Sequence, residues 1–301
     1  MNFGFFGFPS SHNSGTPYPT VEFDSSGSYV VPRGAKLLYI FCISGGGGGS
    51  TGIVTGAGVS TGNGYGGGAG QYQYQLVDVE SIGGEGTILD IFIGAGGAGI
   101  AANTFTEIQP GAAGGDGGKT MIAVRGRGLL MLCSRQNGAF QFTSALYNQT
   151  NSFGSVLSFI ILNQGGQTNL TPVATNQSGC AQTSGNISTG NVASSGLSIT
   201  KASSANTMAP ARVALGGTLT AGGSTTIGSM NGADGTFQNA GKFSVGSGGA
   251  GGGTNTAANG GNGGNGYRGG GGGGAGGARS TYTTGKGGDG GNGYCVIMPI
   301  G

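Results

Sequence analysis

The sequence has few charged residues, few prolines and no long apolar stretch, and each shortage excludes a class of protein. Only 7% of the 301 residues are charged and the net charge is +2, so no strong field favours nucleic acid or acidic lipid. Eight prolines without a sustained G-X-Y register exclude collagen. The longest fully apolar stretch, residues 37–43, is far shorter than the roughly 20 residues that span a bilayer. We therefore expect neither nucleic-acid binding nor membrane insertion.

Patterns typical of catalysis are also scarce. His12 is the single histidine and has no supporting carboxylate nearby, so we expect no Ser-His-Asp or Cys-His centre. Asp78 and Glu80 could share one face of a strand as a carboxylate pair, although such a pair is more often a solvated edge. Asp-Gly pairs within glycine stretches fit turns better than a calcium loop, and GGDGGKT lacks the spacing of a phosphate-binding loop. We expect no enzyme, no metal and no cofactor.

The four cysteines do not form a metal or redox motif. Cys42, Cys133 and Cys295 stand in apolar, strand-like settings, and no C-x-x-C spacing occurs. We predict buried, reduced thiols, while the even number, completed by Cys180, leaves disulfides open if the protein is exported. The N-terminus lacks the basic and apolar regions of a signal peptide, so we expect synthesis and assembly in a cytoplasm.

Glycine is abundant, with 75 residues, and it follows a period of three in several places. Gly-Gly pairs separate Asn259, Asn262 and Asn265, and likewise Lys286, Asp289 and Asn292; Ala113, Asp116 and Lys119 repeat the spacing. Three residues per turn is the pitch of an extended left-handed helix that has no internal hydrogen bonds. Several such helices could pack side by side and leave Asn, Lys or Asp on an exposed edge, whereas a lone run would be a flexible tail.

Apolar strands alternate with these glycine stretches, which favours an ordered scaffold over a linker. The patterns predict strands at residues 28–31, 36–44, 71–80, 86–94, 121–124, 129–133 and 294–300. In the third of these, Tyr72, Tyr74 and Leu76 are expected to share one face, with Val79 as a further candidate. The predicted fold class is all-β with polyglycine II-like helices, a glycine-rich sandwich packed on β-strands with essentially no α-helix.

The domain organisation expected from composition is a short arm followed by one glycine-rich domain. Residues 1–26 form the arm, in which Phe3, Phe5, Phe6 and Phe8 lie among glycine, proline and turn-forming residues. Four aromatics in an irregular segment need a docking place, so we predict an anchoring peptide that packs on its own domain or on a neighbouring subunit. Residues 27–301 form the domain, with a Ser/Thr/Asn-rich insertion or subdomain at about 139–215.

The order of the motifs is more specific than any one of them. The series is Tyr29-x-Val31-Pro32-x-Gly34, an apolar strand, glycines 45–49, YGGGAG, an alternating strand, a second strand ending in GAGGAG, GGDGGKT, and a terminal GGDGGNGYCVIMPI. Over about residues 28–133 and 216–301 it resembles the glycine-rich domain of bacteriophage tail-fibre and other virion proteins. That resemblance implies a sandwich of three-fold glycine helices like that of phage tip adhesins, whose connecting loops contact the host receptor.

The expected function follows from this resemblance and from exposed aromatic and basic residues. Five side chains interrupt or flank glycine runs where turns would reach the surface: Tyr65, Tyr267, Arg268, Arg279 and Tyr282. Tyr and Arg suit a receptor face, although the Tyr rings could instead only cover glycine backbone. We expect a virion structural protein of a tail fibre, tail tip or spike that binds a host surface receptor, protein or glycan, and other virion subunits.

Two other functions stay open at this point. One is a capsid decoration or head-fibre subunit that stabilises the shell through the aromatic arm. The other is a cellular glycine-rich wall or ice-binding protein. A homotrimer is expected only by analogy with other spikes.

Overall fold

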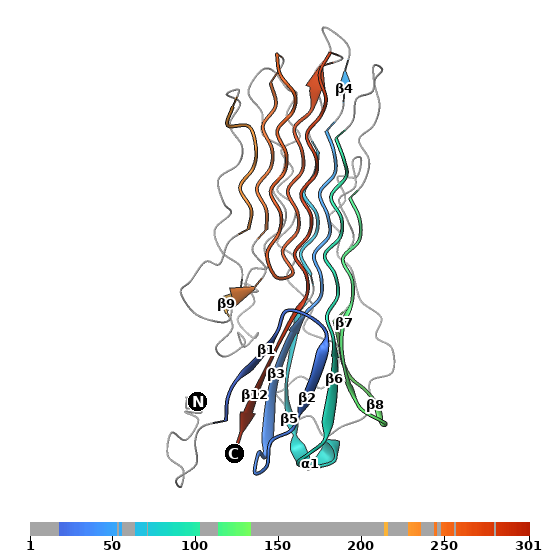
Figure 1. Cartoon of the computed structure of the whole chain (residues 1–301), viewed down its shortest axis with the longest axis vertical. Coiled ribbons are helices and arrows are strands. Elements are labelled where there is room, and N and C mark those ends of the chain that lie inside the picture. The colour runs from blue at the N-terminus through green and yellow to red at the C-terminus, as the bar shows by residue number, and fades with distance from the viewer. Residues whose placement is uncertain are drawn as a thin grey trace, which may run out of the picture.

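The computed structural model describes residues 18–52, 54–55, 64–70, 72–102, 114–133, 214–215, 228–235, 244–245, 248–255, 257–279 and 281–301. The arm's four phenylalanines, His12 and nearly all of the expected central insertion lie outside these residues. The described part is elongated, with two β-sheets at one end and glycine-rich segments extending away from them (Figure 1). It is mostly strand with almost no helix, which confirms that part of the predicted fold class.

Both main sheets have four antiparallel strands. Sheet A has the order β1 (Val21–Phe23), β12 (Tyr294–Ile300), β3 (Leu37–Ile43) and β5 (Tyr72–Asp78). Sheet B has the order β2 (Gly27–Val30), β6 (Ile88–Phe92), β7 (Thr120–Val124) and β8 (Gly128–Cys133). Two short parallel pairs join β4 (Val54–Thr55) to β11 (Ala278–Arg279) and β9 (Ala214–Leu215) to β10 (Ser244–Val245).

The third predicted strand ends earlier than its alternating pattern indicates. The Asp78 side chain accepts the Ser81 N–H at 2.9 Å and so caps α1 (Val79–Ile82), a single turn that ends at Gly83 with φ of 118°. Asp78 and Glu80 therefore do not share a strand, and the expectation that Val79 lies on the tyrosine face is wrong. No helix in the described part of the chain is long and apolar enough to cross a membrane.

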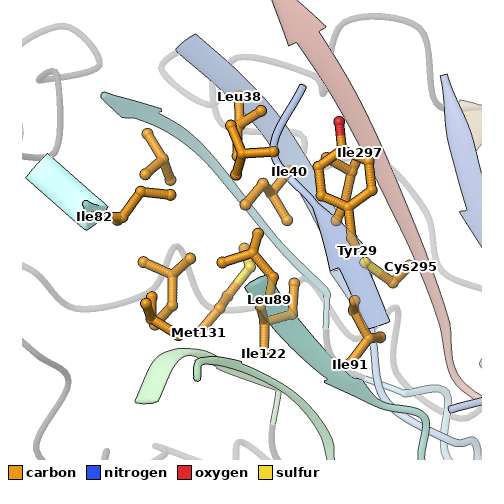
Figure 2. Packing of buried hydrophobic residues seen from close by; sticks show 14 of the residues in the cluster. Tyr29, Leu38, Ile40, Ile82, Leu89, Ile91, Ile122, Met131, Cys295 and Ile297 are labelled. Atoms are coloured by element: carbon orange, nitrogen blue, oxygen red, sulfur yellow. The ribbon is translucent and has the colours of Figure 1, made fainter. Parts of the chain in front are cut away.

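The main core lies between the two sheets (Figure 2). Alternate residues of β3, Leu38, Ile40 and Cys42, face sheet B because side chains along a strand point to opposite faces. Leu89 and Ile122 meet them from the other side. Val21 and Phe23 of β1 also pack on this core, so the structure places the last part of the sequence-defined arm inside the sheet.

The opposite face of sheet A is apolar and buried as well. Tyr39 and Phe41 point to it from β3, and Tyr72 and Tyr74 come from β5. The ring centroids of Phe41 and Tyr72 are 5.9 Å apart, and those of Tyr39 and Tyr74 are 6.3 Å apart. Tyr72, Tyr74 and Leu76 do share this face, as predicted. Because β3 is buried on both sides, it reads as a continuous apolar run rather than an alternating one.

Buried tyrosines predict a loss of stability in alkali. Burial raises the pKa of Tyr29 from 10.0 to about 12, and it also raises the pKa of Tyr39 and Tyr294. The fold favours the neutral phenol, so this stabilisation is complete below pH 10 and is lost as the pH rises through 10 towards 12. For Tyr29 alone the expected loss is on the order of 2 kcal/mol. Denaturant unfolding across this pH range measures it.

The matched variant for that measurement is Tyr29→Phe, which removes one phenol and keeps the ring. We expect its free energy of unfolding to fall less steeply above pH 10 than that of the unmodified chain. If tyrosinate absorbance showed Tyr29 ionising near its ordinary pKa in the folded protein, the prediction would be wrong.

The glycine runs, as we call the extended segments between sheets and turns, lie side by side along the long axis (Figure 1). Their described residues are 44–52, 64–70, 93–102, 114–119, 228–235, 248–255, 257–266, 269–277 and 283–293. Several continue directly from a strand, as run 44–52 does from β3 and run 283–293 does into β12. The sheet strands therefore fix one end of each of these two runs.

Hydrogen bonds between the runs repeat every three residues. In run 44–52, residues three apart donate their N–H groups to the same neighbouring run, and three successive residues donate to three different runs. The pairs are Gly45 and Gly48 with Gly118 and Gly115, Gly46 and Gly49 with Gly291 and Gly288, and Gly47 and Ser50 with Gly68 and Tyr65. The run is thus surrounded by partners and satisfies its backbone laterally rather than within itself.

Close approach of the runs explains why glycine fills them. A Cβ built on Gly49 would overlap the carbonyl oxygen of Gly273, and one built on Gly46 would overlap that of Gly270. Runs 44–52 and 269–277 are buried along their whole described length. In these inner runs the space that a side chain would take is occupied by the next backbone.

Candidate functional site

The structure separates the five candidate receptor residues into two groups. Tyr267 and Arg268 form a turn beside sheet A. Arg279 and Tyr282 lie at the opposite end of the glycine runs, which we call the distal end, where β11 pairs with β4 (Figure 1). Tyr65 is hydrogen-bonded to Ser50, a residue that lies shortly before β4 in the chain, so Tyr65 belongs with the distal group.

The Tyr267–Arg268 turn is engaged by the protein itself. Arg268 has φ of 32°, a left-handed conformation that is uncommon for a residue with a side chain. Its Nε and Nη2 donate to the two carboxylate oxygens of Asp24 at 2.9 and 3.0 Å, and Nη1 lies 3.4 Å from Glu22. The guanidinium also lies over the Tyr294 ring, 3.9 Å from its centroid. We call this arrangement the arginine clamp.

The arginine clamp leaves little of Arg268 for a ligand. Its side chain is only 14% exposed. Tyr294 donates a short hydrogen bond from its hydroxyl to Glu22, and burial together with this bond raises the pKa of the phenol. The clamp joins the turn after run 257–266 to β1 and β12 of sheet A. Its evident role is to fix the glycine runs onto the sheets.

The distal group is built differently. Arg279 stands in β11 opposite Thr55, and the Tyr282 N–H donates to the Arg279 carbonyl at 2.7 Å to close the turn that follows. The Tyr65 N–H donates to Ser50 Oγ at 2.7 Å. Arg279 Nε is buried and has no hydrogen-bond partner. Side chains on turns at the end of a rigid element are well placed to meet a partner.

A regular polar surface runs along the side of the molecule, and we call it the polar ladder. Asn259, Asn262 and Asn265 accept the N–H groups of Thr283, Lys286 and Asp289 on their Oδ1 atoms, at 2.8–2.9 Å. The side chains of Asn231 and Asp234 accept backbone N–H groups of run 257–266 in the same way. Those of Asp289 and Asn292 accept backbone N–H groups of run 93–102. Of the two sets 259–265 and 286–292, the side chains of Asn259, Asn262, Asn265, Lys286 and Asn292 are exposed, and Asp289 is half-buried.

The polar ladder confirms the predicted exposed edge and adds a role that the sequence did not reveal. The Asn side chains are lateral hydrogen-bond acceptors, so each one replaces a backbone carbonyl at the surface of the runs. The signal was present in the sequence, since Asn and Asp recur at the three-residue spacing. The period alone does not state which neighbouring run supplies the donor.

The titratable groups do not form a reactive centre in the described part of the chain. Cys42, Cys133 and Cys295 are free and buried together in the main core, as predicted for reduced thiols. Burial raises the pKa of Cys42, which disfavours the thiolate that a nucleophile needs. Within the same residues, no three His, Cys, Asp or Glu side chains are grouped to hold a metal ion.

Comparison of the sequence with known protein families and with curated proteins found no match.

Proposed function

We propose that this chain is a non-enzymatic structural protein of a bacteriophage particle, carried on a tail fibre, tail tip or spike, where it presents its distal turns to a host surface receptor. We further infer that the glycine runs are polyglycine II-like helices packed as a glycine-rich sandwich on the strands. The observation that carries both ideas is the three-residue repeat of hydrogen bonds around run 44–52. It supports a stiff stem, and recognition by loops is most effective on a rigid scaffold.

The free energies of backbone ordering and hydrogen bonding favour packed glycine runs over isolated ones. Ordering each backbone costs about 1–2 kcal/mol, and a net hydrogen bond returns about 1 kcal/mol. An isolated glycine run would therefore stay disordered, whereas a run with bonded neighbours on several sides and an apolar core at its base can be stable. Run 44–52 has such neighbours, and it continues from β3, the strand buried on both faces.

Hydrogen exchange tests the proposed packing of the runs. We expect the N–H groups of Gly46, Gly49 and Gly272 to be protected to the level of the β3 amides, because each donates to a neighbouring run at 2.8–2.9 Å. Glycines of the surface turns, such as Gly126, serve as the unprotected reference. Equal, fast exchange in runs and turns would refute the packed lattice.

The location on the particle tests the proposed function. Antibody-labelled or tagged protein should be found at the tail by electron microscopy, and the purified chain should adsorb to host cells and block infection. Label on the capsid facets would instead favour the decoration subunit, which the aromatic arm with Phe3, Phe5, Phe6 and Phe8 would attach. Protein that neither adsorbs nor blocks infection would count against receptor binding.

A further inference from the structure

The face of sheet B that points away from the main core is apolar but only partly covered. Leu89 and Ile122 enter the main core, so the residues that alternate with them along the strands point outward (Figure 2). The register places Phe92 opposite Met121, and Val30 is 57% and Phe92 47% exposed. We call this surface the outer face, and its large apolar residues are Val30, Ile88, Phe92, Met121, Leu129 and Leu132.

The sequence of sheet B indicates that the outer face has a partner. An antiparallel sheet with one side in water normally alternates apolar and polar residues. β7 reads TMIAV and β8 reads GLLMLC, so both strands carry apolar residues on each side. The carboxylate of Asp90 on this face is held by Arg125 at 3.1 and 2.5 Å and needs no further partner. A contiguous apolar patch of this kind marks a contact site.

The described chain begins close to the outer face. The Tyr18 hydroxyl donates to the carbonyl of Arg33 at 3.1 Å, and the Tyr18 ring packs on the edge of the main core. Arg33 is three positions after Val30, a span of about 10 Å in extended chain. Phe8 is ten positions before Tyr18, which allows a reach of about 33 Å. The phenylalanines of residues 1–17 can therefore reach the outer face of their own chain.

The length of the phenylalanine segment also matches the outer face. Val30 lies opposite Ile88, and Phe92 is four residues further along β6, so Val30 and Phe92 are about 14 Å apart. The stretch from Phe3 to Phe8 spans about 17 Å when extended. The far side of sheet A offers no comparable place, because its aromatic residues are already buried.

We propose that residues 1–17 lie across the outer face of sheet B in the same chain, with their phenylalanine rings packed on Val30, Phe92 and Met121. Of the two docking places expected from the sequence, this selects the arm's own domain over a neighbouring subunit. The inference does not rest on receptor binding. It bears on the alternative function, since an arm held on its own domain is not free to attach the chain to a capsid.

Chymotrypsin cleavage of the folded full chain tests the proposal. The enzyme cuts after phenylalanine only where the backbone is accessible, so the cleavage rate after Phe3, Phe5 and Phe6 follows the undocked fraction of the arm. Mass spectrometry measures that rate, and a synthetic peptide of residues 1–17 gives the rate without docking. We expect slow cleavage in the unmodified chain and about tenfold or faster cleavage in Phe92→Ser, because a buried ring contributes that much to a docking equilibrium.

The matched control is Tyr282→Ser, which removes an aromatic ring at the distal end and should leave the cleavage rate unchanged. A second reporter is Phe6→Trp, since the chain has no other tryptophan. We expect its emission to be that of a buried indole and to resist quenching by acrylamide. Adding Phe92→Ser should shift the emission to that of an indole in water.

Several results would overturn the proposal. One is cleavage of the unmodified arm as fast as that of the free peptide, and another is equal acceleration in Phe92→Ser and Tyr282→Ser. A fully quenched indole in Phe6→Trp would mean that a second copy or residues 134–213 cover the outer face instead. A buried emission that disappears on dilution, while sedimentation shows a dimer dissociating, would place the arm on a neighbouring copy. Emission independent of concentration supports docking within one chain.

Discussion

We expect Gly49→Ala to lower the free energy of unfolding by about 3 kcal/mol or more, the upper end of the range for forcing extra atoms into a packed interior. The added Cβ would overlap the carbonyl oxygen of Gly273 and lie 2.6 Å from its carbonyl carbon. Relief requires run 44–52 to move away from run 269–277. The same movement weakens the bonds from Gly49 N–H to Gly288 at 2.8 Å and from Ile100 N–H to Gly49 at 3.2 Å.

Chain entropy acts in the opposite direction but is smaller. Alanine restricts the unfolded chain more than glycine does, which stabilises a protein by about 0.4–1 kcal/mol where the folded conformation accepts the methyl group. At Gly49 the overlap with backbone atoms exceeds that gain, because backbone on both sides cannot rotate out of the way as a side chain can. The net effect is therefore destabilising.

Gly27→Ala is the matched control. A Cβ at Gly27 would contact the Phe23 ring at 3.4 and 3.5 Å, which is ordinary packing distance. We expect this variant to be neutral or slightly stabilising. Denaturant unfolding monitored by circular dichroism compares the two variants. If Gly49→Ala unfolded at the midpoint of the unmodified chain, the glycine runs would not be closely packed.

The strands were largely predictable from the sequence because their signal is local. The continuous apolar run of β3 and the alternation in β5 state which residues are buried, whatever they pack against. The end of β5 was not predictable in the same way. Val79 continues the apolar pattern, but Asp78 caps the next turn and changes the direction of the chain.

The three-residue period of the glycine runs was also predictable from short stretches of sequence. Which runs pack next to one another was not. Gly-Gly spacing indicates that Asn262 and Asn265 project from the same side, and both are exposed. Their bonding partners, Lys286 and Asp289, are determined by which runs lie side by side. That order depends on the turns and on the two sheets together, which no short window of sequence contains.

The candidate site shows the same division between local and distant causes. Arg268 follows a tyrosine and precedes glycine, so its sequence surroundings predict an exposed turn. The structure brings Asp24 to it from 244 positions away in the chain. Arg279 has similar surroundings and receives no such partner among the described residues. Pairing between distant segments therefore explains why Arg268 is held by the protein itself, which its sequence surroundings do not indicate.

The arginine clamp predicts the second large effect, a loss of about 2–3 kcal/mol in Arg268→Ala. The variant removes a two-pronged bond to Asp24, the contact with Glu22 and the stacking on Tyr294. Truncating one partner of a fully buried pair costs about 3–5 kcal/mol, and the partial exposure of the two carboxylates reduces this. Cation–π stacking contributes a further share of about 1 kcal/mol.

Arg125→Ala is the control, because Arg125 forms the same two-pronged bond to Asp90 with a side chain that is 53% exposed. Such surface pairs contribute little to stability, because solvent and salt screen the attraction between the two charges. We therefore expect Arg125→Ala to unfold near the midpoint of the unmodified chain. Equal losses in the two variants would mean that Arg268 is not fixed in the clamp, and it would return to the candidate ligand-binding residues.

Arg268→Gly separates the effect of losing the side-chain contacts from the effect of the left-handed backbone conformation. Glycine accepts the φ of 32° at this position more readily than alanine, so it should be less destabilising than Arg268→Ala by about 1 kcal/mol. Both variants lack the guanidinium, and each should show a much smaller further loss when Asp24→Asn is added than the unmodified chain does. Full additivity in that double-mutant cycle would contradict the clamp, because residues that share one interaction do not act independently.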